Sequence, residues 1–360
     1  MISCPSFHSV RIIADDLTGA CDTAVAFACV GMVTEVETTW SIRTASNAAV
    51  IAWNTESREI SVMSSNARID EAASRLEKDP AHHVFKKIDS IFRGNSFSEI
   101  AACLVKFPHE IAVLAPAFPE LGRTLRDGVL TANDFFGKHH RDIAEGLQNA
   151  GVAPHKVSSA ACIREAYASG SRVVLCDSET EQDLLAIVGE SLNLAGAGRV
   201  LWIGSGGLAH ALASVLSSAE APSCPTVTGS TVVFVVGSDH PVTLRQLEHL
   251  RLAGANAVVV PIDQEISHAQ LRETLAPYAD RGVSCLFATG GDTALAVCRA
   301  LEIDCLRVEC EFSRGLPQSR ILGGPFKGAH YIMKSGGFGE HDVLSRIAQA
   351  FTHARTSERR

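Results

Sequence analysis

Charged residues in the first half of the chain gather in short turns that each follow an apolar run. Asp15 and Asp16 follow VRIIA, and Arg58 lies in the turn after AVIAW. Arginine and lysine can hold a carboxylate, arginine in a bidentate manner. An aspartate at a strand end can accept a hydroxyl proton during phosphoryl transfer. We interpret these turns as a site for a small acid, with Asp16 as the first candidate for a general base and Asp89 as the second.

The candidate substrate-binding residues come from four such turns. They are Asp15, Arg58, Lys87, Ser90, Arg93, Gly94, Asn95 and Arg123. Lys86 and Lys87 are neighbours on an expected strand and point to opposite faces, so at most one of them faces a site. The alternatives are structural: Asp15 and Asp16 would be a helix N-cap and an exposed acid, and Arg93 would form a surface ion pair.

Glycine-rich turns in the second half suggest an anion site. Each lies between an apolar run and a helical pattern, where glycines let the backbone approach a phosphate and the first-turn amides favour negative charge. The candidate residues are Ser238, Gly290, Gly291, Asp292, Thr293, Lys334, Ser335, Gly336 and Gly337. One such turn could simply cap a helix, but three in one small domain favour a phosphate-bearing ligand, namely a nucleotide.

Two known nucleotide-binding motifs can be compared with the chain. The chain has no Walker A sequence, so it is not a P-loop enzyme. Residues 204–209, GSGGLA, fit the dinucleotide pattern G-x-G-x-x-A, but no strand-ending acidic residue follows about 20 positions later. A nicotinamide-dependent dehydrogenase that uses Gly204 to Ala209 is therefore one alternative function. A sugar-acid sensor that binds without turnover is another.

Short apolar runs that alternate with helical patterns must position these turns. The runs lie at 10–14, 49–53, 82–88, 111–115, 172–176, 199–203, 231–237, 256–262, 283–289 and 329–333. This alternation predicts parallel sheets covered by helices on both faces, and ligands bind beyond the carboxyl ends of such strands. We expect an α/β protein of two domains, each a mostly parallel sheet flanked by helices, with the active-site cleft between them.

The domain boundaries follow from a Ser-, Pro- and Thr-rich stretch at 217–230. We expect an N-terminal domain at 1–220, a linker at 221–230 and a C-terminal domain at 231–351. Residues 352–360, which carry Arg355, Arg359 and Arg360, are expected to form a disordered tail.

The composition limits partners and location. The chain has 360 residues, 46% of them hydrophobic, and a net charge of −8, which argues against a nucleic-acid or anionic-membrane partner. The eleven cysteines form no pair with two-residue spacing, so we expect buried free thiols and no metal site. No secretory signal or membrane span is visible, so we expect a cytoplasmic protein. A homodimer would be unsurprising.

The chain resembles the four-carbon acid sugar kinases, which include D-threonate, D-erythronate and 3-oxo-tetronate kinases. The resemblance rests on ordered blocks along nearly the whole chain. They are ADDLTGACDTAVAF (14–27), KKIDSIFRGN (86–95), APAFPELGRT (115–124), GSGGLA (204–209), VGSDHPVT, TGGDTALAV and MKSGGFG. It implies a sugar-acid domain followed by an ATP domain. ATP contacts would fall on Ser238, on Gly290 to Thr293, and on Gly336 or its neighbours.

The implied reaction transfers the γ-phosphoryl group of ATP, with Mg²⁺, to the terminal hydroxyl of a four-carbon acid. The same resemblance makes GSGGLA a structural or substrate-side turn. The sequence departs from the family in two places. Ile91 and Phe92 stand where Thr and Leu are usual, and the segment after Gly128 is shorter than in typical members. Both lie on the substrate side.

Overall fold

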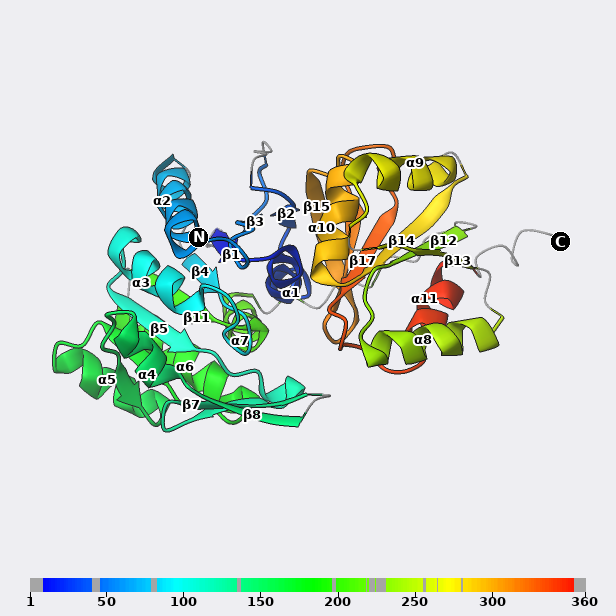
Figure 1. The fold of residues 1–360 in the computed structure, drawn as a ribbon. Helices are drawn as coiled ribbons and strands as arrows, with labels where there is room; N and C mark the ends of the chain where they lie inside the picture. The colour runs from blue at the N-terminus through cyan, green and yellow to red at the C-terminus, as the bar shows by residue number, and fades with distance from the viewer. Residues whose placement is uncertain are drawn as a thin grey trace, which may run out of the picture.

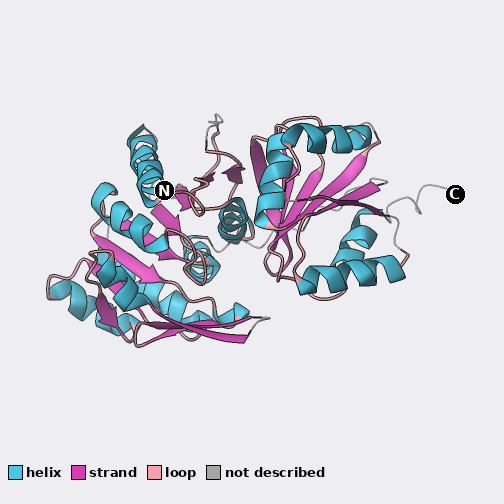
Figure 2. Cartoon of the chain, in the orientation of Figure 1, coloured by secondary structure: helices cyan, strands magenta, loops and turns pink. Residues whose placement is uncertain are grey.

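The computed structural model of the chain describes residues 9–40, 46–78, 83–134, 137–195, 199–217, 219, 224, 231–254, 257–263, 265–279 and 281–352. It shows two α/β halves side by side (Figure 1), in which helices flank a core of strands (Figure 2). The predicted linker at 221–230 lies outside the described residues except for Cys224, as do residues 353–360 of the predicted tail. Thr352 still belongs to the last helix, so the tail prediction began one residue too early.

The first half is built on parallel strands. They are β1 (Val10–Ala14), β2 (Thr34–Glu37), β3 (Val50–Asn54), β4 (His83–Lys87), β5 (Ile111–Ala115), β9 (His155–Val157), β10 (Val173–Cys176) and β11 (Val200–Gly204). Most of these strands are apolar and fully buried, as expected for parallel strands covered on both faces. Successive residues therefore pack on opposite sides: Ile12 belongs to one core and Ile13 to the other.

Helices cover both faces of these strands. They are α1 (Leu17–Ala28), α2 (Val62–Lys78), α3 (Ser96–Lys106), α4 (Ile143–Asn149), α5 (Ala160–Ala168), α6 (Glu181–Ala195) and α7 (Gly206–Leu216). Buried side chains of α1, α6 and α7 pack on one face, and those of α2, α3 and α4 on the other. A 3₁₀ turn, η1 (Pro119–Leu121), leads into a separate antiparallel sheet of β6 (Arg123–Arg126), β7 (Val129–Asp134) and β8 (Gly137–Asp142).

The second half has the same layered plan. Its strands are β12 (Thr231–Val236), β13 (Ala257–Pro261), β14 (Val283–Thr289), β15 (Cys305–Ser313), β16 (Leu316–Ile321) and β17 (His330–Lys334). Its helices are α8 (Pro241–Leu252), α9 (His268–Ala279), α10 (Gly291–Ala300) and α11 (Val343–Thr352). Buried residues of α8 and α11 pack on one face of the strands, and those of α9 and α10 on the other.

The two halves share one sheet, which the sequence did not predict. Its order is β13-β12-β14-β17-β16-β15-β2-β3-β1-β4-β11-β5-β10-β9, and β2 joins β15 in antiparallel pairing. Neither β2 nor β15 was expected as a strand because charged residues interrupt both. Glu35 on β2 and Arg307 on β15 compensate each other, with 2.6 Å between carboxylate and guanidinium.

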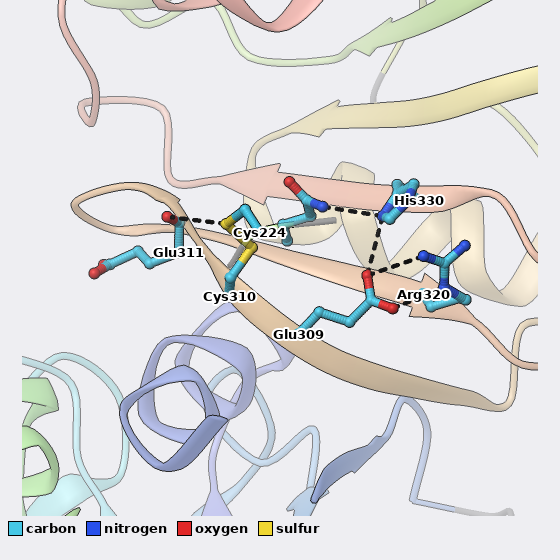
Figure 3. The surroundings of a disulfide bond; sticks show 7 residues. Cys224, Glu309, Cys310, Glu311, Arg320 and His330 are labelled. Atoms are coloured by element: carbon cyan, nitrogen blue, oxygen red, sulfur yellow. Dashed lines mark hydrogen bonds and ion pairs between the residues drawn. A yellow bond between two sulfur atoms is a disulfide. The ribbon is translucent and has the colours of Figure 1, made fainter. Parts of the chain in front are cut away.

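A disulfide joins Cys224 to Cys310 on β15 (Figure 3). The expectation that the cysteines are all free thiols was therefore wrong for this pair. Their sequence separation of 86 gave no spacing signal, since only the fold brings the two together. Cys21, Cys103, Cys176, Cys285 and Cys298 are free and buried, as predicted. Among the described residues, no helix is long and apolar enough to cross a membrane.

Candidate active site

Three adjacent strands of the first half end at one edge of the sheet. Ala14 of β1 is in register with Lys87 of β4, which in turn is in register with Gly204 of β11. The segments that follow these strands carry Asp15 and Asp16, the residues from Asp89 to Arg93, and the glycines at the start of α7. The parallel arrangement therefore brings together charged turns that lie far apart in the sequence.

Three adjacent strands of the second half do the same. Val236 of β12 is in register with Thr289 of β14, and Thr289 with Lys334 of β17. The turns after them carry the expected nucleotide-binding residues, namely Ser238, Gly290 to Thr293, and Lys334 to Gly337.

The two edges meet across a cleft. A Cβ atom placed on Gly291, at the start of α10, would lie 3.5 Å from the Thr18 hydroxyl and 3.6 Å from the Asp16 carboxylate at the start of α1. Two helix N-termini from different halves thus face the same small volume. Both favour negative charge.

Two cavities continue from this point. The first is lined by Asp16, Asp22, Arg58, Lys87, Asp89, Ser90, Arg93 and Phe118 from the first half, and by Gly315, Met333, Lys334, Ser335 and Phe338 from the second. The second is lined by Ser90, Ile91, Arg93, Arg123 and Asn133 on one side, and by Ser238, His240, Gly291, Ser335, Gly336 and Gly337 on the other. Asp292 lines a third recess of the cleft beside Asp15, Asp16 and Arg58.

Asp15, Asp16 and Arg58 form one hydrogen-bonded group. Arg58 binds Asp15 with two nitrogens at 2.8 and 2.9 Å and donates to Asp16 at 2.8 Å. Burial alone would raise the pKa of Asp15, but Arg58, Lys86 and Lys87 together outweigh it and the pKa lies below its usual value. Asp16 is also the N-cap of α1: its side chain accepts from the Gly19 amide at 2.9 Å, and the Thr18 hydroxyl donates to it at 2.6 Å. Asp16 is a cap and a cleft residue at once.

Asp89 is held in a similar way. It accepts from the Arg93 guanidinium at 2.6 and 3.0 Å and from the Arg93 amide at 3.0 Å. Although burial opposes ionisation, these bonds keep the pKa of Asp89 well below its usual value. Arg93 nevertheless keeps 58% of its side chain exposed, so it can still contact a ligand. Arg58 is 14% exposed and lines the first cavity, with three of its five N–H groups bonded to Asp15 and Asp16.

Lys86 and Lys87 face opposite sides of β4. Lys86 forms an ion pair with Glu99 of α3 at 2.6 Å, away from the cleft. Lys87 is 4% exposed and lines the first cavity, and among the described residues its ammonium has no hydrogen-bond or ion-pair partner. A buried, unpaired cation is costly. Lys87 is therefore the cation of the cleft best placed to receive an anionic ligand.

Two expected substrate ligands support the site from behind it. The Asn95 amide donates to the carbonyls of Ser57 and Ile60, at 2.9 and 2.8 Å. Gly94 adopts φ +64, and a Cβ there would lie 2.6 Å from the Arg58 carbonyl. Neither lines the cavities described above. They hold the turn that carries Arg58.

The glycine-rich turns of the second half are fixed by hydrogen bonds and close packing. Lys334 donates to Thr243 at 3.0 Å, to the Gly336 carbonyl at 2.8 Å and to the Ser335 carbonyl at 3.2 Å. It is 1% exposed, and burial lowers its pKa to about 7. A Cβ on Gly336 would lie 2.6 Å from the Ser238 hydroxyl. The backbone here leaves no room for a larger residue, which suits close approach of a phosphate.

Thr293 is buried and packs against Gly237, where a Cβ would overlap its hydroxyl oxygen. Gly290 has φ +97, so the turn before α10 requires glycine. These residues shape the turn, while Ser238, Gly291, Ser335, Gly336 and Gly337 face the cavity.

Asp22 was not among the expected site residues. It lies on α1, lines the first cavity, and its carboxylate would lie 3.0 Å from a Cβ on Gly206. Burial raises its pKa, and Lys87 only partly offsets this. Its spacing gave no signal, because a residue six positions after Asp16 lies about 120° around the helix from it. Phe118 and Phe338 were also missed, because an apolar cleft residue looks like a core residue in a sequence.

The glycines of GSGGLA have a packing role. A Cβ on Gly206 would lie 2.7 Å from the Phe118 ring, and one on Gly207 would lie 2.5 Å from the Ala117 carbonyl. They let α7 pack closely on the segment after β5. A dinucleotide is not needed to explain them.

Comparison with known proteins gives this cleft a family. Residues 10–212 match the family described as "Sugar-binding N-terminal domain", and residues 264–344 match "Nucleotide-binding C-terminal domain". A D-threonate kinase of Cupriavidus necator is 31% identical, with 96% of this chain and 98% of the relative covered. The chain belongs to the four-carbon acid sugar kinase family. It is a phosphotransferase.

Other similarities agree with this. A D-threonate kinase of Bordetella bronchiseptica is 29% identical, with 96% of this chain and 98% of the relative covered. A solved structure described as a putative tRNA synthase from Salmonella typhimurium LT2 has a TM-score of 0.73 and 19% identity, and covers 95% of this chain and 99% of its own. The last similarity concerns the fold alone.

Proposed function

We propose that this kinase transfers the γ-phosphoryl group of ATP to the terminal hydroxyl of a four-carbon acid sugar. The proposal rests on one observation: Asp16 and Thr18 lie close to Gly291 across the cleft. This contact places a carboxylate that can accept a proton beside a helix N-terminus that can bind a phosphate. The relatives described above are D-threonate kinases, so D-threonate is the first substrate to test.

In this proposal the acid end of the substrate binds Lys87 and the exposed face of Arg93. Arg58 acts indirectly, because its guanidinium is already bonded to Asp15 and Asp16. Ser90, Arg123 and Asp22 lie where they can bind hydroxyl groups.

The reacting hydroxyl lies next to Asp16. Its oxygen forms a bond to the γ-phosphorus, its proton passes to the Asp16 carboxylate, and the bond from the γ-phosphorus to the bridging oxygen breaks to release ADP. Asp89 is the second candidate for the proton acceptor, although Arg93 lowers its basicity. Ser238, Gly290 to Thr293 and Ser335 to Gly337 would surround the triphosphate, and Lys334 lies beneath them.

The described residues contain no group of three or more histidine, cysteine or acidic side chains suited to a metal ion. Mg²⁺ usually binds through one or two carboxylates plus the substrate phosphates, and Asp292, which lines the cleft, fits that need. Mg²⁺ would neutralise charge on the phosphates when bound. The site thus suits a cation that arrives with ATP.

A screen for ADP release tests the proposal, with D- and L-threonate, D- and L-erythronate and their 3-oxo forms as acceptors. We expect ATP-dependent turnover of at least one acid. Calorimetry with ATP and with NADH separates the alternatives. Heat with NADH but not ATP favours the dehydrogenase, and acid binding without ADP release favours the sensor. No heat with adenine nucleotides on demonstrably folded protein would remove the proposal.

We also propose a cytoplasmic location. It is supported by the absence, among the described residues, of any helix able to cross a membrane. Cell fractionation tests it. In the cytoplasm the Cys224–Cys310 pair would meet reducing thiols, which makes its redox state worth measuring.

A further inference from the structure

The small sheet β6–β7–β8 flanks the cleft. Arg123 of β6 and Asn133 of β7 line the second cavity directly. The side chains of β8 are exposed along its whole length. Arg141 is nevertheless engaged: its guanidinium donates to the Ile91 carbonyl at 3.1 Å and to the Phe92 carbonyl at 2.7 Å.

These two carbonyls belong to the turn between β4 and α3, which carries Asp89, Ser90 and Arg93 into the cleft. The turn has an unfavourable backbone, because Phe92 adopts φ +60, a conformation that costs a non-glycine residue about 1–2 kcal/mol. Such a turn needs contacts that hold it. Arg141 supplies two of them from outside the turn.

Aromatic packing continues the same support. The buried ring of Phe92 stacks on Phe97 of α3 with 5.0 Å between centroids, and the Arg141 guanidinium lies 5.2 Å from the Phe97 ring. A Cβ on Gly146 of α4 would overlap the Phe97 ring, so α4 packs directly against it. The segment from β8 to α4 and the turn after β4 therefore form one packed unit.

We propose that Arg141 is a positioning residue for the sugar acid. It holds the turn from Asp89 to Arg93 in the form in which Ser90, Ile91 and Arg93 line the cleft, and so makes β8 part of the specificity of the site. The inference rests on the proposed function. It predicts that a change on an exposed strand outside the cavity alters the use of the acid but not of ATP.

The substrate class that this unit would select is a short, compact acid. Ile91 and Leu121 give the second cavity an apolar edge, and Arg123 lies beside them. If the turn is held rigidly at Ile91, the apolar edge of the cavity stays in place against the carbon chain of the substrate acid. A loosened turn would bind all of the acids more weakly and discriminate less between them.

The test compares Arg141→Ala with Lys138→Ala. Lys138 is an exposed cation on the same strand. We expect Arg141→Ala to raise KM for the acid about tenfold or more, because two hydrogen bonds from a charged donor are lost, while KM for ATP stays within about twofold. Lys138→Ala should behave as the wild type. Arg141→Lys can still donate a hydrogen bond, so its KM for the acid should stay close to that of the wild type.

Hydrogen exchange of residues 88–95 gives a second readout that does not need turnover. The Ile91 and Arg93 amides are bonded to Asp89, so we expect them to exchange faster in Arg141→Ala than in Lys138→Ala. Equal exchange in the two variants overturns the inference, as does an equal rise of KM for acid and ATP. If the wild type turns over no acid, the proposed function fails, while the exchange result still decides whether Arg141 holds the turn.

Discussion

The two sides of the cleft recognise charge by different means. The first half uses side chains: Arg58 is bonded to Asp15 and Asp16, and Arg93 to Asp89. The second half uses backbone, with glycines at positions where a Cβ would meet Ser238 or Thr293. In the function proposed above, the first design would distinguish one small acid from another through the placement of each charge. The second would accept a phosphate chain through amides that every residue possesses, so it would depend on shape.

The two designs also differ in how they handle buried charge. Asp15 and Asp89 are each compensated by an arginine, and their pKa values lie below the usual range. Lys334 has only neutral hydrogen-bond partners, and its pKa falls to about 7. Removing one member of a compensated buried group leaves an unpaired charge. Substitutions on the acid side should therefore affect turnover, and those on the nucleotide side should affect ATP binding.

The largest effect is expected from Asp16→Asn. The amide can still cap α1 through its oxygen, but it can no longer take up a hydroxyl proton. Acid–base groups contribute about 10²- to 10⁴-fold to rate, so kcat should fall by that order, while calorimetry shows ATP binding close to wild type. Near-normal turnover would remove Asp16 from the role, and the same measurement on Asp89→Asn would then test the second candidate.

A smaller effect, on the other side, is expected from Gly336→Ala. The added Cβ would lie 2.6 Å from the Ser238 hydroxyl and 3.0 Å from the His240 Cβ, so the turn must move. We expect KM for ATP to rise about tenfold, with KM for the acid unchanged. Gly323→Ala is the matched control, because nothing lies within 4 Å of a Cβ there. If Gly336→Ala impaired acid binding instead, the division between the two sides would be wrong.

The repeated pattern of apolar run, turn and helix predicted where the parallel strands end. It therefore also predicted which turns share a sheet edge. It could not show that the two halves share a sheet, because β2 and β15 are rich in charge that is compensated only in the fold. The helix N-cap offered as the structural alternative is Asp16, which caps α1 at Leu17, but Asp15 is buried instead of exposed.

Within the candidate site, residue types were easier to predict than partners. Lysine and arginine in a charged turn suggested carboxylate binding. Nothing local shows that Arg58 is occupied by Asp15 and Asp16, or that Asn95 bonds the backbone behind the cleft. Such pairings join residues some 40 positions apart. The role of Arg141 could not be predicted for the same reason, since its partners are backbone carbonyls of a distant turn.

The buried lysine of the nucleotide side predicts a pH effect on stability. The pKa of Lys334 is about 7 in the folded chain, against an ordinary value of 10.5. Between these values the unfolded chain binds more protons, so this group makes the free energy of unfolding rise as pH increases from about 7 toward 10. Urea unfolding at pH 7 and pH 9 measures this. From pH 7 to pH 9 the free energy of unfolding should rise more for the wild type than for Lys334→Met. Equal changes in the two proteins would contradict a depressed pKa.

The smallest effect on turnover is expected from the disulfide. Cys310 lies on β15, the strand that joins the two halves, yet neither cysteine lines the cavities of the cleft described above. Reduction should leave both KM values unchanged while it lowers the free energy of unfolding, by about 4–5 kcal/mol if loop-closure entropy over the 86-residue separation is fully realised. Chemical unfolding with and without dithiothreitol measures this. Cys310→Ser controls for it, because its stability should not respond to the reductant. A change of KM for ATP on reduction would instead mean that β15 transmits the state of the disulfide to the turn between Lys334 and Gly339, and the nucleotide side would then depend on more than local shape.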